Sequence, residues 1–383
     1  MLTIFFLFEM FVSWLSGFSQ NVIKGDNNEG REELIFARQV ASIPDEISES
    51  SGIAVATPNH IWSHNDAGNT NELFCFDTTG TLLRQLLISN VNNIDWEDLT
   101  QDDQQRMYIN DAGNNGNDRR NLKIYRIPNP ENISGNIVQA EIIKFDLEDQ
   151  VQFPPPESNW NYDIEAIIWK SDSLYLFTKN RCNPQTGICK LYKVPAQPGN
   201  HIAQLMDAVF LGTSDKEARV TSADINLSTG ELLLLTETKI VSFTDYPDNR
   251  FFDGNMTSYY FSNTVGQVEG VGFVGNGNLY LTEEGNENDN GFLYTVKWKN
   301  TSAVTEKMTD KISLFPNPFT SEITADLPFD GSVTMDIIDI EGNVVLQNII
   351  YEKQLCLNHL NPGIYIIKIT TEHKTFIRRI VKL

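Results

Sequence analysis

The sequence predicts an all-β protein in two parts: a five-bladed β-propeller over residues 32–299, with six blades as the alternative, and a small immunoglobulin-like β-sandwich over residues 312–383. Three observations support this prediction. Short strand-like segments recur along the chain with hairpin turns between them, no long amphipathic helix competes between residues 30 and 300, and the composition changes at Ile312. With 383 residues, 40% of them hydrophobic, the chain can bury one large core and a second, smaller one.

Each repeat unit starts with an apolar anchor in an innermost strand. The anchors are separated by 46, 68, 58 and 46 residues, and they are Ile53, Leu99, Ile167, Ile225 and Val271. Each anchor is followed by a turn and a second strand, as in "RMYINDA" and "NLYLTEE", and the turns contain the Gly, Asn and Ser residues that hairpins need. Four antiparallel strands recurring at roughly fifty residues are typical of propeller blades.

The last unit predicts how the ring closes. This unit ends near "GFLYTVKW" with three strands only, whereas the strand-like segment "EELIFARQV" at residues 32–40 belongs to no unit. We expect this early segment to supply the fourth strand of the last blade, because closure leaves no open sheet edge.

Polar residues recur at the two places that meet at the mouth of a propeller, namely just before each innermost strand and just after each second strand. The expected metal ligands there are Glu97, Asp111, Glu165, Glu237, Glu269 and Glu283. The residues expected to bind substrate are His64, Asp66, Lys179 and Arg181. Facing carboxylates repel one another, and three arrangements relieve the repulsion: a bound Ca²⁺, protonation of one acid, or pairing with Lys179 and Arg181. The alternative is structural, since "NDAGN" is also an ordinary Asx turn.

The sequence leaves three functions open. The first is a calcium-dependent hydrolase of phosphate or other esters, the second a noncatalytic module that binds a glycan or peptide, and the third a structural surface protein. The chain has no G-x-S-x-G elbow, no glycine loop for phosphates and no H-E-x-x-H helix, so an enzyme would have to use a metal or paired carboxylates. Fold alone does not choose among the three.

The N-terminus and the charge predict an exported protein. Residues 1–19 have the apolar run and the small final residues of a signal peptide, although no Lys or Arg precedes the run and Glu9 interrupts it. A membrane anchor is the alternative, but an apolar stretch long enough to span a bilayer is missing. A net charge of −22 argues against nucleic acid or an anionic membrane as partner, and we expect a monomer.

The cysteines fit the same compartment. Cys182 and Cys189 bracket the turn-rich "CNPQTGIC", where a hairpin and a disulfide are predicted, with free thiols as the alternative. Cys75 and Cys356 lie in apolar strand patterns and are expected in a core, and no paired Cys and His spacing indicates a zinc site. The tryptophans Trp62, Trp96, Trp160 and Trp169 are expected to pack between blades, and Trp160, in a loop, is also placed to stack on a sugar.

The C-terminal part follows a polar linker at residues 300–311. Residues 312–383 contain, in order, "SLFPNPF", "DIEGNVV", "LNPGIYIIKI" and the basic end "IRRIVKL". The segment resembles the type A C-terminal sorting domain of proteins exported by the type IX secretion system of Bacteroidota. The resemblance implies contact with that secretion machinery, delivery to the cell surface or outside the cell, and recognition or folding roles for Pro316, Asn317, Pro318 and Gly363. An ordinary immunoglobulin-like module is the alternative.

Residues 32–300 carry a looser resemblance. The succession of "SGIA", "NDAGN" and a strand with Leu, Asp and Gly is similar to secreted propellers of the esterase-like phytase, strictosidine-synthase-like and calcium-dependent apyrase groups. Their catalytic residues do not match this sequence one by one, so the resemblance implies a fold and not an activity.

Overall fold

The computed structural model describes residues 31–275, 277–285, 290–298, 313–327, 333–339, 344–350, 353–370 and 375–383. These residues are almost entirely β-strands and turns, as predicted. The signal peptide expected at 1–19 and the linker expected at 300–311 lie outside the described residues. Within the described part, α-helix is confined to α2 (Asp215–Ala218), and no helix is long and apolar enough to cross a membrane.

The first two sheets are antiparallel meanders of four strands each. The first consists of β3 (Ser50–Thr57), β4 (His60–Asn65), β5 (Glu72–Phe76) and β6 (Leu82–Ile88), and β10 (Ile137–Val138) pairs with β6 in parallel. The second consists of β7 (Leu99–Gln101), β8 (Met107–Asp111), β9 (Lys123–Ile127) and β11 (Glu141–Leu147).

The third sheet continues the same pattern. It consists of β12 (Asp163–Lys170), β13 (Ser173–Lys179), β14 (Ile188–Pro195) and β15 (Gly199–Phe210). Its outermost strand β15 pairs in parallel with β11, so the second and third meanders share one continuous eight-stranded sheet. A parallel pair at the outer rim ties two neighbouring meanders together through backbone hydrogen bonds.

The fourth and fifth sheets both recruit a strand from the beginning of the described chain. The fourth consists of β16 (Val220–Ile225), β17 (Leu232–Thr236), β18 (Lys239–Thr244) and β19 (Asn255–Phe261), extended in parallel by β1 (Arg31–Ile35). The fifth consists of β20 (Val268–Val274), β21 (Asn278–Glu283), β22 (Phe292–Lys297) and β2 (Ala37–Ser42).

The predicted ring closure is confirmed for the second half of the segment at 32–40. Strand β2 pairs antiparallel with β22, as a fourth strand of the last sheet should. Its first half forms β1 instead, which extends the neighbouring sheet. The N-terminal segment therefore holds two sheets together by supplying the outermost strand of each.

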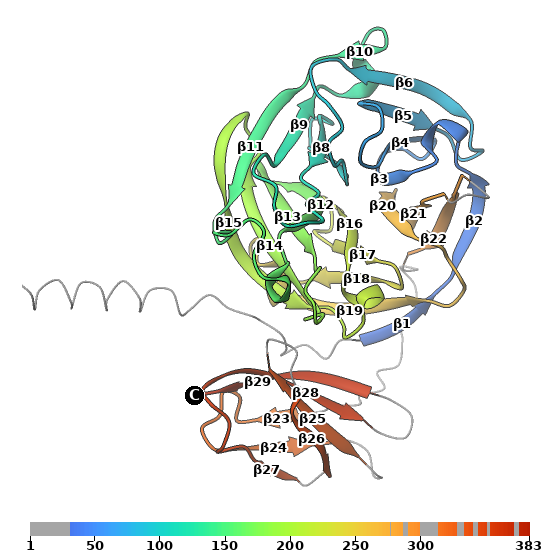
Figure 1. Ribbon diagram of the computed structural model, residues 1–383. Coiled ribbons are helices and arrows are strands. Elements are labelled where there is room, and N and C mark those ends of the chain that lie inside the picture. Colours follow the sequence, from blue (N-terminus) through green and yellow to red (C-terminus); the bar gives the residue numbers. More distant parts are fainter. Residues whose placement is uncertain are drawn as a thin grey trace, which may run out of the picture.

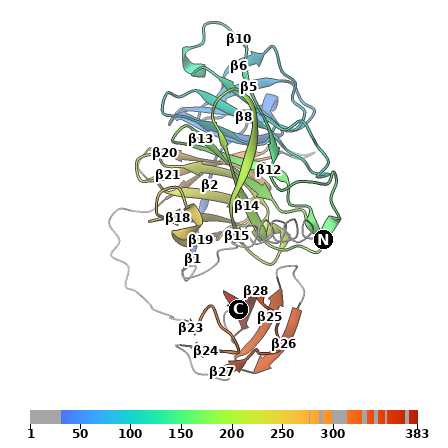
Figure 2. The same ribbon diagram turned by 90° about the vertical axis from the view of Figure 1, so that its left-hand side faces the viewer.

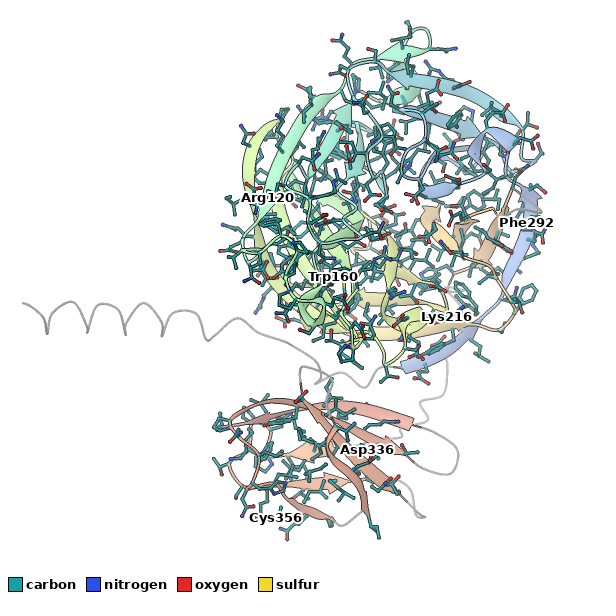
Figure 3. All side chains as sticks on the ribbon, in the orientation of Figure 1. Arg120, Trp160, Lys216, Phe292, Asp336 and Cys356 are labelled. Carbon is teal, nitrogen blue, oxygen red and sulfur yellow. The ribbon has the colours of Figure 1, made fainter. Side chains whose placement is uncertain are left out.

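The sheets form a propeller-like ring (Figure 1). The innermost strands lie side by side in a closed circle, in the order β3, β7, β12, β16 and β20. Apolar side chains fill the space between neighbouring sheets, so each pair of sheets has its own core. Trp62 and Trp96 are buried between the first and second sheets and Trp169 between the second and third, as expected. Trp160 (Figure 3) is half-buried in a connection, where its indole N–H donates to Pro155.

Buried polar side chains connect innermost strands of different sheets. The Asp98 Oδ2 atom accepts hydrogen bonds from the backbone N–H groups of Ile167 (3.1 Å) and Ala223 (3.0 Å), and Oδ1 accepts one from the Ser222 hydroxyl at 3.0 Å. Ser222 Oγ in turn accepts from the backbone N–H of Val271 at 3.2 Å. These side chains supply acceptors to inward-facing N–H groups that would otherwise be buried without a partner.

The C-terminal part is a separate set of two small sheets packed over one core (Figure 2). One sheet has the order β23 (Ser313–Phe315), β24 (Glu322–Asp326) and β27 (Gln354–Cys356). The other has the order β26 (Val344–Ile350), β25 (Thr334–Asp339), β28 (Gly363–Thr370) and β29 (Thr375–Lys382). Ile323 and Leu355 of the first sheet and Met335 and Ile367 of the second meet in this core.

Two predictions about cysteines are wrong in the structure. No disulfide joins Cys182 and Cys189: both thiols are free and buried. Cys189 lies on β14 in the core between the third and fourth sheets, whereas Cys182 lies in the preceding connection, where its N–H donates to Asn180. Cys356 (Figure 3) is exposed rather than buried, because it follows core residue Leu355 on β27 and so points to the opposite face.

Candidate functional site

A polar pocket of about 210 Å³ opens among the ends of the innermost strands. Residues from the first, second, third and fifth sheets and their connections line it, and they are Ser51, Asp66, Glu97, Asn115, Glu165, Lys179, Arg181, Gln267, Glu269 and Glu284. We call this the central pocket. Among the described residues the fourth sheet contributes none of the lining, and Thr221 stands there at the bulge position that Glu165 and Glu269 occupy in their sheets.

Six of the ten predicted metal and substrate residues lie together at this pocket. They are Glu97, Glu165, Glu269, Asp66, Lys179 and Arg181. The topology explains the convergence, because the first strand of each meander begins, and the second ends, at the same end of the ring. Residues far apart in sequence therefore face one opening.

Glu165 is the best-paired acid of the central pocket. It is buried, and its Oε2 lies 3.0 Å from Lys179 Nζ while its Oε1 lies 2.9 Å from Arg181 Nη2. Burial alone would raise the pKa of this carboxyl, but the two cations more than offset it and lower the pKa to about 2. Glu165 is therefore an anion at all physiological pH values.

The pKa values of the neighbouring acids Glu97 and Glu269 are raised, in contrast to that of Glu165. Burial and the charge of Glu165 raise the pKa of Glu97 well above its usual value, so Glu97 is the protonated partner in its hydrogen bond with Glu165. Burial also raises the pKa of Glu269 to about 7, although Lys179 opposes the shift. The Glu269 Oε1 atom accepts a hydrogen bond from Gln267 Nε2 at 2.8 Å, and Glu269 forms no ion pair with the described residues. The pKa values of Asp66 and Glu284 are raised as well, so the pocket holds one permanent anion beside four carboxyls with raised pKa values.

Three acids of this cluster were missed by the sequence analysis: Asp95, Asp163 and Glu284. Asp163 accepts from Arg181 Nε at 2.6 Å, and Asp95 lies 3.8 Å from Arg119. The signal was present in "DWE" at 95–97 and "DIE" at 163–165, where an acid stands two residues before the predicted glutamate. Residues two apart on an extended chain share a face, so each predicted glutamate brings the earlier acid with it.

Three predicted metal ligands point elsewhere. Asp111 pairs with Arg119 at 3.0 Å and accepts from the Tyr125 hydroxyl at 2.7 Å. Glu283 accepts from the Tyr294 hydroxyl, and Glu237 pairs with Lys216 (Figure 3) at the wall of a neighbouring surface pocket.

The register explains the position of Glu283. Glu283 stands opposite the core residue Val268, and the bulge after Val268 turns Glu269, not its neighbour, toward the central pocket. The side chain of Glu283 shares the face of Val268, whereas Glu284, one residue later, lines the pocket.

His64 does not line the central pocket either. Its side chain is fully buried, its ring stands edge-on to Trp96 with centroids 5.4 Å apart, and Nδ1 bonds to the backbone oxygen of Asn65 at 2.9 Å. Burial lowers the pKa of this imidazole to about 4, so it is neutral at physiological pH. His64 is a packed structural residue in this position.

The repeated "NDAGN" sequence serves two different purposes. Gly68 adopts a φ of +77° with open space around it, which is the turn that the sequence suggested. A Cβ atom on Gly113 would come within 2.2 Å of Glu97 Oε1 and 2.6 Å of the Asp95 carboxyl carbon. The second copy therefore needs glycine to let the backbone approach the acids of the central pocket.

Two sets of three acids bring ligand atoms within 4.8 Å of one another around Glu97. In the set Glu97, Asp163 and Glu165, Lys179 and Arg181 already supply the compensating charge. In the set Asp66, Asp95 and Glu97, the ion-pair partner among the described residues is Arg119, 3.8 Å from Asp95. This second set offers several oxygen ligands and less compensating positive charge than the first, which is what a hard divalent cation prefers.

Comparison with known proteins identifies the C-terminal part. Residues 313–383 match the family model of the secretion system C-terminal sorting domain. The chain is therefore an exported protein, located at the cell surface or secreted, whose sorting domain interacts with the type IX secretion machinery. Pro316, Asn317, Pro318 and Gly363 all lie in the matched region, where Asn317 Oδ1 accepts from the backbone N–H of Val381 at 2.8 Å.

No curated protein matches the sequence. Among solved structures, the gluconolactonase XC5397 from Xanthomonas campestris is 11% identical, with 70% of this chain and 87% of that one covered and a TM-score of 0.38. An extracellular domain from B. thetaiotaomicron, assigned to the one component system BT4673, is 12% identical, with 90% and 59% covered and a TM-score of 0.33. Similarities at this level assign no activity to the chain.

The raised pKa values in the central pocket predict that the protein loses stability as pH rises. The pKa of Glu269 and of Asp163 is about 7 in the folded protein, against 4.5 and 3.8 for the free groups. The folded state therefore holds more protons between about pH 4 and 7, so its stability is greatest below that window and declines across it, by up to about 3 kcal/mol for Glu269 and about 4 kcal/mol for Asp163. Thermal unfolding at pH 5.5 and 8 should show the higher melting temperature at pH 5.5.

Glu269→Gln provides the matched control for this prediction. The amide keeps the size of the side chain but does not titrate, so the variant should melt closer to the same temperature at both pH values. It should also be more stable than the wild type at pH 8. If the melting temperatures of Glu269→Gln at pH 5.5 and pH 8 differ as much as those of the wild type, the pH dependence comes from other groups.

Proposed function

We propose that residues 31–298 form a five-bladed β-propeller and that its central pocket is the active site of an exported, divalent-cation-dependent ester hydrolase. The observation that carries this proposal is the gathering of carboxyl groups from four sheets in one small pocket, some ionised and some protonated. Such a division between neighbouring acids is typical of sites that perform acid–base chemistry. The volume of about 210 Å³ suits a small substrate or one small group of a larger one.

The charge balance of the pocket supports a cation and a neutral ester. The described acids around it are Asp66, Asp95, Glu97, Asp163, Glu165, Glu269 and Glu284, and the cations are Arg119, Lys179 and Arg181. Because the acids outnumber the cations, the pocket attracts positive charge and repels a free phosphate ester. Lys179 and Arg181 serve mainly to keep Glu165 ionised, so the expectation that they bind substrate loses support.

Asp66, Asp95 and Glu97 would hold the cation, for which Ca²⁺ is our first candidate. When bound, such a cation polarises the carbonyl group of an ester. Glu269 would act as the general base: Gln267 occupies its Oε1, and its other oxygen, which accepts no hydrogen bond from the described residues, would take a proton from an attacking water. Glu97 would release its proton when the cation binds, because a carboxyl ligand must be ionised, and Lys179 and Arg181 would hold the neighbouring Glu165 as a fixed anion.

Two matched variants test the proposal. The purified protein, treated with chelator and then titrated with Ca²⁺, Mg²⁺ or Mn²⁺, should hydrolyse at least one member of a panel of carboxyl esters, lactones and phosphate esters. Glu269→Gln should lower kcat by about 10²–10⁴-fold with little change in cation affinity. Glu97→Gln should weaken cation binding measured by calorimetry. Glu237→Gln, outside the central pocket, should change neither quantity.

The outcomes separate the candidate functions. Cation binding that is lost in Glu97→Gln, with no hydrolysis of any ester, would favour the noncatalytic binding module. No cation binding to the wild type at millimolar concentration would remove the metal from the proposal. Full activity in Glu269→Gln would remove the assigned base.

A further inference from the structure

A second cluster of potential ligands lies at the other end of the first sheet. His60, Cys75 and Glu131 bring one ligand atom each within 4.8 Å of one another. His60 begins β4, and Asp66 of the central pocket follows the end of the same strand, so the two clusters are about 20 Å apart at the usual rise of an extended chain. The cluster is therefore independent of the central pocket and of the hydrolase proposed for it.

Strand pairing explains why the first two residues meet. His60 and Trp62 lie two residues apart on β4 and share a face, and Cys75 on β5 stands directly opposite Trp62. This face packs against the second sheet, where Trp62 and Cys75 enter the shared core. Cys75 is only 2% exposed, whereas the side chains of His60 and Glu131 are 41% and 29% exposed. The cluster thus has a buried sulfur and a solvent-facing rim.

Glu131 comes from η2 (Pro130–Asn132), in the connection that follows the second sheet's strand β9, and this connection is firmly held. Arg84 donates to the backbone oxygens of Pro130 and Ile133, each at 2.6 Å, and to that of Gly135. Asn129 caps the turn by accepting from the Glu131 N–H at 2.9 Å. The Arg84 guanidinium group thus donates to three backbone carbonyl groups, and these hydrogen bonds fix the position of the loop that contains Glu131.

The ligand orientations are also supported by neighbours. Trp62 Nε1 donates to Glu131 Oε1 at 2.6 Å, which leaves Oε2 facing His60 Nδ1 at 2.8 Å. Metal-bound carboxylates are commonly oriented in this way by a second donor. In a tetrahedral site, neighbouring ligand atoms lie roughly 3.4–3.6 Å apart, so the His60–Glu131 contact would open slightly and the sulfur would move closer. Both partly exposed side chains can make such a movement.

We propose that His60, Cys75 and Glu131 form a binding site for a divalent transition metal, with Zn²⁺ as the fitting ion, that joins the first sheet to the connection between β9 and β11 of the second sheet. A thiolate, an imidazole and a carboxylate form a mixed set that suits Zn²⁺ and excludes Ca²⁺ and Mg²⁺, which prefer oxygen alone. The fourth coordination position faces solvent at the His60 side. Binding releases the thiol proton of Cys75 to solvent, because the ligand is the thiolate.

Cobalt substitution of the full chain tests this site, since thiolate-bound Co²⁺ gives a sulfur-to-metal charge-transfer band and tetrahedral Co²⁺ gives strong visible bands. A Cys356→Ser background removes the exposed thiol. One equivalent of Co²⁺ should produce both features, and Zn²⁺ should displace them. Cys75→Ser should abolish the charge-transfer band, and His60→Gln and Glu131→Gln should each weaken Zn²⁺ binding by about 10–100-fold or more.

Two control variants and one folding check complete the design. Cys189→Ser, at another buried thiol, and Glu237→Gln, outside both clusters, should leave the cobalt spectrum unchanged. If Cys75→Ser does not fold, as judged by circular dichroism, the half-exposed His60→Gln decides the question. The absence of a charge-transfer band in the parent protein, its persistence in folded Cys75→Ser, or unchanged Zn²⁺ affinity in His60→Gln would overturn the site.

Discussion

Asp98→Ala is expected to lower the free energy of unfolding by about 4 kcal/mol, because one buried carboxyl accepts four hydrogen bonds. The donors are the backbone N–H groups of Leu99, Ile167 and Ala223 and the hydroxyl of Ser222. Asp98 is fully buried, and burial raises the pKa of this carboxyl well above its usual value. Alanine leaves the donors from the third and fourth sheets without an acceptor in a place that water does not reach.

Urea unfolding of three variants measures this effect. Asp98→Asn keeps one acceptor oxygen and turns an N–H₂ group toward donors, so we expect a loss of about 2–3 kcal/mol. Asp103→Ala, at an exposed neighbouring position, should change the free energy by less than about 0.5 kcal/mol. A loss below about 1 kcal/mol in Asp98→Ala would show that Asp98 does not hold the innermost strands together.

Glu165→Gln should destabilise the folded protein by about 3 kcal/mol, because it removes the buried anion that pairs with two half-buried cations. Lys179 would lose its 3.0 Å partner, and Arg181 would keep only Asp163. The neutral amide also removes the negative charge that keeps the proton on Glu97. The loss should appear as a fall in melting temperature of several degrees at pH 7.

The double variant Glu165→Gln/Lys179→Met separates the ion pair from general packing. Removing the second charge together with the first leaves no unpaired ammonium, so the double variant should be more stable than Glu165→Gln alone. The low pKa of Glu165 also determines how this effect depends on pH. The contribution of Glu165 to the free energy of unfolding is complete above about pH 4.5 and is lost only as the pH falls toward 2. Equal stability of the single and double variants would contradict the assigned pairing.

Much of the ring was predictable because its signals are local. Alternating apolar residues, turn residues and the apolar anchors predicted the innermost strands, and the free segment at 32–40 predicted the closure that β2 makes with β22. The carboxyls before the innermost strands were predictable for the same reason, since topology places those positions at one end of the ring. The sorting domain was recognisable from four short motifs in order.

The exact membership of the central pocket depended on features that no local pattern carries. A single bulge turns Glu269 inward and leaves Glu283 opposite Val268, facing away. Asp111 forms an ion pair with Arg119, eight residues later in the chain, and Glu237 forms one with Lys216 at the wall of another pocket. His60 and Cys75 met Glu131 only because the first two sheets pack together.

Strand positions, the acidic ends of the innermost strands and the export domain thus follow from the order of residues, because period-two alternation and turn chemistry act over a few neighbours. The partner of each charged side chain follows from the three-dimensional arrangement instead. Bulges shift the facing of a strand by one residue, and contacts between sheets join segments that are tens to hundreds of residues apart in the chain.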